Sequence, residues 1–181
     1  MTVVSEGKIE AIKYARTHKV PFLGLCLGMQ LAIVEFARDV VGYHDAHSVE
    51  LNPKHYTSGS YTSCLTRSVL KTSVEPFVLV LILVFLTKNP KAYKLYGKEE
   101  IHERHRHRYE VNNDYRDALT QNGMLLSGLS PDGRIVEMVE IPEHPWFIGT
   151  QAHPELKSRP NKPHPLFKGF VEASLEYSKE N

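Results

Sequence analysis

Apolar residues in the first quarter of the chain follow two spacings, which predict a helix, a strand and a second helix. Residues 8–17 place apolar side chains three positions apart, on one face of a helix. Residues 20–25 form a short apolar run, which is typical of a buried parallel strand. Residues 29–38 return to helical spacing, with Leu31 and Val34 in the apolar stripe. The pattern therefore predicts a strand that leads directly into a core helix.

The second half of the chain also mixes helical and strand periods. Residues 101–111 alternate every two positions, which predicts a strand with arginines on one side and histidines on the other. Beyond it we expect a short helix, a hairpin, a strand and a closing amphipathic helix, at residues 113–121, 124–141, 146–151 and 167–177. Asn112 or Asn113 would cap the short helix, and Gly123 would end it. Mixed strands and helices predict an α/β sheet protein.

One apolar segment, residues 77–86, stands out for its length without a charge. It is too short to span a bilayer, which needs roughly 20 residues. A buried strand is therefore the simplest interpretation.

Composition narrows the classes of function. A length of 181 residues fits one domain, and the net charge of +1 favours neither nucleic acid nor an anionic membrane as a partner. The two cysteines, Cys26 and Cys64, form no disulfide framework, so a reducing compartment fits this chain. The N-terminus lacks the apolar core of a signal peptide. We therefore expect a cytoplasmic protein.

Cys26 lies between Gly24 and Gly28, directly after the first predicted strand. A cysteine at a strand-to-helix turn between glycines has the sequence pattern of a nucleophile elbow. The sulfur would lie at a helix N-terminus, where the helix dipole favours the thiolate. A buried structural cysteine is the alternative interpretation, because free cysteine behaves as a small hydrophobic residue.

A histidine and a carboxylate follow the predicted strand at residues 146–151. His153 is separated from Glu155 by one proline. A nucleophilic thiol needs a base, and that base needs an acceptor that orients its other nitrogen. His153 and Glu155 can supply both functions, so Cys26, His153 and Glu155 are the candidate catalytic residues.

The elbow and the His-Pro-Glu run together resemble the class I glutamine amidotransferases. Four further segments, residues 6–9, 46–50, 103–112 and 158–160, are similar to the glutaminase domain of the CTP synthase family. The resemblance covers residues 6–53 and 87–177. It implies an α/β fold with a flavodoxin-like open sheet flanked by helices.

The resemblance also implies roles for individual residues. Cys26, His153 and Glu155 would form the triad that releases ammonia from L-glutamine, with the Leu27 N–H as an oxyanion donor. The glutamine site would be lined by Leu27, Gly28, Met29, Gln30, Glu50 and Arg108. Glu50 would bind the substrate's α-ammonium, and Arg108 its carboxylate, which suits a planar guanidinium.

The histidine-rich block invites two other interpretations. His102, His105 and His107 could indicate zinc, but no second Cys/His pair stands nearby and the interleaved arginines repel a cation. A basic run could indicate nucleic acid, but neighbouring glutamates dilute it. We therefore expect no metal site and no nucleic-acid partner.

The chain departs from this family at its start. The family carries an N-terminal synthetase domain that uses ATP and magnesium to convert UTP to CTP and through which the family assembles into homo-oligomers. That domain, the first strands of the glutaminase domain and a glycine-rich loop before Glu6 have no counterpart here. We therefore expect a fragment that is incomplete at the N-terminus, contains no cofactor itself and is weak or inactive. A binding-only fragment and a free-standing class I glutaminase are the alternatives.

A second departure covers residues 54–86, where the family has a Gly-Gly-Thr-Met-Arg-Leu-Gly stretch. One possible coding of residues 71–85, read two bases later, gives Gly-Gly-Thr-Ile-Arg-Leu-Gly. Our hypothesis is that this segment is translated out of frame. Resequencing the gene across it tests that hypothesis.

Overall fold

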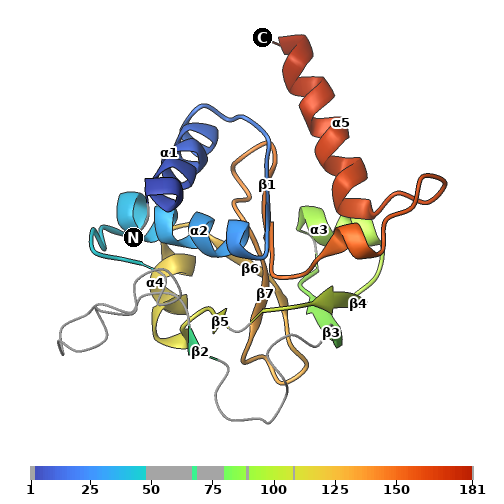
Figure 1. The fold of residues 1–181 in the computed structure, drawn as a ribbon, viewed down its shortest axis with the longest axis horizontal. Helices are drawn as coiled ribbons and strands as arrows, with labels where there is room; N and C mark the ends of the chain where they lie inside the picture. The colour runs from blue at the N-terminus through green and yellow to red at the C-terminus, as the bar shows by residue number, and fades with distance from the viewer. Residues whose placement is uncertain (1–2, 48–66, 69–79, 89, 108, 181) are drawn as a thin grey trace.

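The computed structural model describes residues 3–47, 67–68, 80–88, 90–107 and 109–180 (Figure 1). The α-helices are α1 (Val3–Thr17), α2 (Leu27–Phe36), α3 (Lys91–Tyr96), α4 (Arg116–Gln121) and α5 (Pro165–Glu180). The strands are β1 (Phe22–Leu25), β2 (Arg67–Ser68), β3 (Val80–Leu86), β4 (Glu100–His105), β5 (Tyr109–Glu110), β6 (Leu125–Leu129), β7 (Val136–Glu140) and β8 (Phe147–Thr150). Within the described part of the chain, no helix is long and apolar enough to cross a membrane.

The main sheet is mixed and has six strands in the order β1-β8-β7-β6-β3-β4. β1 and β8 are parallel, whereas every other neighbouring pair in this sheet is antiparallel. The parallel register runs from Phe22 beside Phe147 to Leu25 beside Thr150. The two strands therefore end at the same level, and the segments that follow them leave the sheet side by side.

Helices cover both faces of the sheet (Figure 1). One core lies between the sheet and α1 and α2, and the other lies on the face that carries α3 and α5. Strand residues divide between them by alternation: Phe147 belongs to the first core, and the next residue, Ile148, belongs to the second. Residues 3–17 and 27–36 form helices because their apolar positions face the first core, and α2 is buried on all sides from Met29 to Phe36. The predicted α/β architecture is confirmed.

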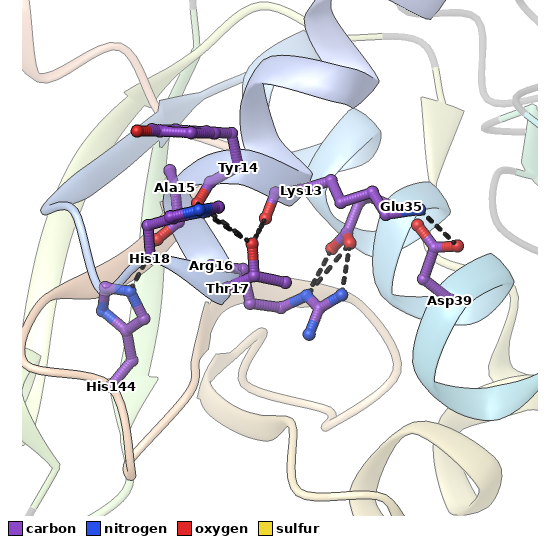
Figure 2. Close-up of polar contacts among 9 residues, drawn as sticks. All are labelled: Lys13, Tyr14, Ala15, Arg16, Thr17, His18, Glu35, Asp39 and His144. Carbon is purple, nitrogen blue, oxygen red and sulfur yellow. Dashed lines mark hydrogen bonds and ion pairs between the residues drawn. The ribbon is translucent and has the colours of Figure 1, made fainter.

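Two polar contacts fix α1 against its neighbours (Figure 2). The Arg16 guanidinium binds both carboxylate oxygens of Glu35, at 2.7–3.0 Å, and the Glu35 side chain is fully buried. Burial raises the pKa of Glu35, and the hydrogen bonds and charge of Arg16 oppose that rise. On the other side, His144 Nε2 lies 3.0 Å from the carbonyl oxygen of Ala15. The last turn of α1, just before β1, is thus held on one side by α2 and on the other by the segment between β7 and β8.

Most predicted elements are confirmed, with small changes of boundary. The helix predicted at 8–17 begins earlier, and the one predicted at 29–38 begins at Leu27 and continues as a π-helical turn, η1 (Ala37–Val41). The helix predicted at 113–121 begins as a 3-10 turn, η3 (Asn113–Tyr115), capped by the Asn112 side chain. The hairpin forms from β6 and β7, and Gly133 has a φ of 71° in its turn.

The single strand predicted at 101–111 is wrong. β4 ends at His105 and a separate strand, β5, begins at Tyr109 and pairs with β2. Local bonding explains the break, because His107 Nδ1 lies 2.9 Å from the carbonyl of Tyr109, two residues along. The expected alternation holds within β4, where Arg104 is exposed and His105 is buried.

The apolar run at 77–86 contributes β3, which pairs with β4 and, at its end, with β6. Val84 and Leu86 enter the second core, whereas Leu81 is 52% exposed, so the strand is half-buried rather than buried. Residues 54–66 and 69–79 lie outside the described residues, and the out-of-frame hypothesis stays a prediction.

Candidate active site

Cys26 occupies a sharp turn between β1 and α2. Its φ of 48° and ψ of −105° lie in a region that non-glycine residues rarely adopt, and such strain concentrates at functional positions. The neighbouring strand holds the turn, because the Cys26 N–H donates to the Thr150 carbonyl at 2.8 Å. Cys26 is partly exposed and forms no disulfide. Cys26 thus lies at a sharp strand-to-helix turn, which is the local geometry that a nucleophile elbow requires.

Packing requires a glycine at only one of the two positions that flank Cys26. A Cβ on Gly24 would lie 2.8 Å from the Gly28 carbonyl carbon and 2.9 Å from the Met29 nitrogen. Gly24 therefore lets the first turn of α2 lie directly on β1. A Cβ on Gly28 would meet nothing within 4 Å, so internal packing does not require glycine there.

His153 and Glu155 lie on the segment that follows β8. His153 Nδ1 lies 2.7 Å from Glu155 Oε1, and the two side chains are 25% and 47% exposed. A histidine held at Nδ1 by a carboxylate has Nε2 left for proton exchange. The His153 N–H donates to the Arg104 carbonyl at 2.8 Å, which anchors this segment to β4. Since β1 and β8 end in register, Cys26 and His153 both follow strand ends at one edge of the sheet.

The structure adds Gln151, which the sequence did not single out. This residue directly follows β8, is fully buried, and places its Nε2 3.5 Å from Cys26 Sγ. Its Oε1 accepts a hydrogen bond from Gln30 Nε2 at 3.3 Å. Gln151 stands two residues before the candidate histidine, but a buried glutamine has no sequence signal that separates it from an ordinary strand-end residue.

The predicted glutamine-binding residues divide into four groups. Leu27 and Gly28 are partly exposed in the first turn of α2, whose leading N–H groups have no partner within the helix. Met29 is fully buried against Gly149, so its side chain belongs to the core. Gln30 is buried and bonded to Gln151. Glu50 and Arg108 lie outside the described residues.

One group of side chains has the spacing of a metal site. His105, His107 and Glu137 each offer a ligand atom, and these atoms lie within 4.8 Å of one another. His105 and Glu137 are buried, and burial lowers the pKa of His107. His102, grouped with these histidines in the sequence, alternates to the exposed face of β4. The cluster thus differs in membership from the three histidines that the sequence analysis considered for zinc and set aside.

Known proteins resemble this chain in sequence and in structure. The family model for class-I glutamine amidotransferases matches residues 2–173. CTP synthase from Staphylococcus aureus is 55% identical over 174 residues, which make up 96% of this chain and 32% of that protein. The chain thus spans about a third of the length of the curated relatives it matches.

Solved structures agree with the sequence match. The Trypanosoma brucei CTPS glutaminase domain with bound acivicin has a TM-score of 0.85 and 32% sequence identity, and the match covers 95% of this chain and 66% of that one. A glutamine amidotransferase from Thermotoga maritima has a TM-score of 0.52 at 13% identity, over 97% of this chain and 70% of that one, which bears on the fold alone.

Proposed function

The chain belongs to the class I glutamine amidotransferase family, and on that premise we propose that it hydrolyses glutamine to glutamate and ammonia. His153 takes the proton of the Cys26 thiol as the sulfur attacks the side-chain amide carbon, and it passes that proton to the leaving nitrogen as the C–N bond breaks. His153 then deprotonates a water that attacks the thioester, and the proton returns to the Cys26 sulfur as glutamate leaves. Glu155 holds the imidazole through Nδ1 and stabilises its protonated form.

One observation carries this proposal: the strained Cys26 turn is bonded to the end of the strand that leads to His153. The Cys26 N–H to Thr150 carbonyl bond of 2.8 Å supports a fixed relation between the thiol turn and the histidine segment. The 2.7 Å contact of His153 with Glu155 supports a base with a defined orientation. The leading N–H groups of α2, starting at Leu27, are suited to the developing oxyanion.

The wider reaction follows from the relatives' name. We propose that the ammonia is passed to a synthetase domain that forms CTP from UTP and ATP. The 55% identity to CTP synthase supports this assignment over other uses of ammonia. The match covers 32% of that protein, and the structure that this chain resembles in Trypanosoma brucei CTPS is named a glutaminase domain.

The experiment is a glutaminase assay on the 181-residue chain with the matched variants Cys26→Ser and Cys64→Ser. We expect slow release of glutamate and ammonia, in equal amounts, from the parent and from Cys64→Ser, and release of neither from Cys26→Ser. A glutamine analogue that alkylates active thiols should label Cys26 in a tryptic map. Labelling without turnover would favour a binding-only chain, and the absence of both would overturn the proposal.

A second assay separates the CTP assignment from a free-standing glutaminase. The chain is added to a CTP synthase whose own glutaminase cysteine has been replaced by serine, with UTP, ATP and glutamine. CTP formation above that of the serine enzyme supports transfer of ammonia to a synthetase domain. Glutamate release with no gain in CTP favours a free-standing glutaminase.

A further inference from the structure

The Gln151 side chain joins the candidate nucleophile to the interior of the protein. Its amide lies between two groups: Nε2 is 3.5 Å from Cys26 Sγ, and Oε1 is 3.3 Å from Gln30 Nε2. The side chain is fully buried, and its backbone N–H donates to the Glu137 carbonyl at 2.8 Å. Water therefore has little access to this amide, and its protein partners decide which end faces the sulfur.

The Tyr109 carbonyl oxygen, which can only accept hydrogen bonds, sets the orientation of the Gln30 amide. Gln30 Nε2 lies 3.5 Å from the Tyr109 carbonyl oxygen, so the NH₂ end of this amide faces Tyr109. The same NH₂ group donates to Gln151, whereas Gln30 Oε1 has no partner among the described residues. If Gln30 were turned over, two oxygens would face each other at Tyr109. Gln151 consequently presents its own oxygen to Gln30 and its NH₂ group to Cys26.

The Tyr109 carbonyl is itself held in place. His107 Nδ1 lies 2.9 Å from this oxygen and must carry the proton, because the carbonyl cannot donate. Burial lowers the pKa of His107, which keeps the imidazole neutral and leaves Nε2 as an acceptor. His105 Nδ1, 3.4 Å from that Nε2, therefore carries its proton.

The same contacts lead back to Gln151 through Glu137 of β7. His105 Nδ1 lies 3.1 Å from a carboxylate oxygen of Glu137, and both side chains are buried. The Glu137 carbonyl in turn accepts the Gln151 N–H. The group formed by His105 of β4, His107 after it and Glu137 of β7 thereby fixes Gln151 from two directions, through its side-chain amide and through its backbone.

We propose that Gln151 donates a hydrogen bond to Cys26 Sγ that stabilises the thiolate, and that Gln30 is the positioning residue that keeps the donor end of Gln151 toward the sulfur. The inference rests on the proposed role of Cys26 as the nucleophile. An N–H donor favours a thiolate over a thiol because the negative sulfur is the stronger acceptor. The elbow then receives help from a side chain in addition to the N-terminus of α2.

The test is the pH dependence of Cys26 alkylation by iodoacetamide in the full 181-residue chain, followed by peptide mapping to separate Cys26 from Cys64. We expect Gln151→Met to move the inflection up by about one pH unit, which leaves about tenfold less thiolate at pH 7. The plateau rate at high pH should rise slightly, since a more basic thiolate is a better nucleophile. Gln30→Met keeps Gln151 but frees its amide to turn, so we expect a shift of about half a unit.

Gln121→Met is the matched control, because Gln121 is exposed at the end of α4. The other titratable groups on the neighbouring segments, His153, Glu155, His107 and Glu110, are common to parent and variants. Thermal unfolding shows which variants fold. If Gln151→Met does not fold, the inflection measured in Gln30→Met tests the inference instead. An unchanged inflection in a folded variant overturns the inference. Iodoacetamide needs no glutaminase activity, so a shifted inflection in a chain that does not hydrolyse glutamine would overturn only the proposed function.

Discussion

The backbone N–H of Cys26 donates to the carbonyl oxygen of Thr150 at 2.8 Å, which ties the residue after β1 to the last residue of β8. A strained residue persists only where its surroundings hold it. Here one hydrogen bond continues the parallel ladder past the end of the edge strand β1, so the strained turn at Cys26 is held by the pairing of β1 with β8. The candidate thiol therefore rests on the sheet rather than on a free loop.

Gly24→Ala should destabilise the protein, whereas Gly28→Ala should not. The methyl group that Gly24→Ala adds would lie 2.8 Å from the backbone of α2, and the strain of such overpacking typically costs about 1–3 kcal/mol. The methyl group that Gly28→Ala adds meets nothing within 4 Å, and alanine is the better helix former. Stability in that variant should therefore be unchanged or higher by up to about 1 kcal/mol. Urea unfolding of the two variants measures both effects.

The same pair tests the substrate site. If the open space at Gly28 receives glutamine, Gly28→Ala should raise KM for glutamine while the protein stays fully folded. A normal KM in Gly28→Ala would place the substrate elsewhere.

Glu155→Gln should lower kcat for glutamine hydrolysis roughly a hundredfold or more, with little change in KM. The carboxylate lies 2.7 Å from His153 Nδ1, and a neutral amide can neither stabilise the imidazolium nor enforce one tautomer. Glu172→Gln is the matched control, because that glutamate is exposed on α5 and lies 3.8 Å from Lys168 in a surface ion pair. Steady-state kinetics of both variants test this role. Equal kcat values would mean that Glu155 does not assist His153 in the reaction.

The sequence predicted the parts of the site that depend on local pattern. Gly24 and Cys26 indicate the candidate nucleophile turn within a few consecutive residues, and His153 with Glu155 indicates the candidate base within a few more. Gln151 was missed because its role depends on the register of β1 against β8 and on the Tyr109 carbonyl, which no local pattern encodes. A side chain that acts through distant partners has no periodicity of its own.

The fold shows the same limit. Alternation correctly placed Arg104 and His105 on opposite faces of β4. The same two-residue period continues in the sequence beyond His105, into residues that form no part of that strand. The local bond from His107 to the Tyr109 carbonyl replaced the ladder there. Similarly, the apolar run that ends at Leu86 predicted a buried strand, but its place near the sheet edge leaves Leu81 half exposed.

Arg16→Met should destabilise the fold by about 3 kcal/mol at pH 7, because it leaves the buried Glu35 carboxylate unpaired. Burial raises the pKa of Glu35, so this carboxyl protonates more readily in the folded protein than in the unfolded chain. Its neutral form is tolerated at low pH, and the loss in the variant should therefore be smaller at pH 5 than at pH 7. Lys13→Met is the control, since its ion pair with Asp39 is exposed.

Denaturant unfolding at both pH values measures this difference. Glu35→Gln in the Arg16→Met background should recover part of the lost stability, because it removes the unpaired charge. An equal loss at both pH values would mean that Arg16 acts through packing of its methylene groups.

His144 should make the stability of the protein depend on pH. Its Nε2 donates to the Ala15 carbonyl (Figure 2). Its Nδ1 accepts from the Trp146 N–H at 3.1 Å, so the buried ring is neutral in the fold. Burial lowers the pKa of His144. At mildly acidic pH the histidine therefore binds a proton in the unfolded chain but stays neutral in the folded protein. Stability should therefore fall as the pH drops below about 6.5, by about 1 kcal/mol per pH unit for each such histidine. His144→Gln should be less stable than the parent at pH 7.5, yet its stability should depend less steeply on pH between 6.5 and 5. His18→Gln, at an exposed position at the end of α1, should keep the parent's dependence of stability on pH.

If stability depends on pH equally steeply in the parent and in His144→Gln, other groups cause the acid sensitivity, and His107 is the next to test.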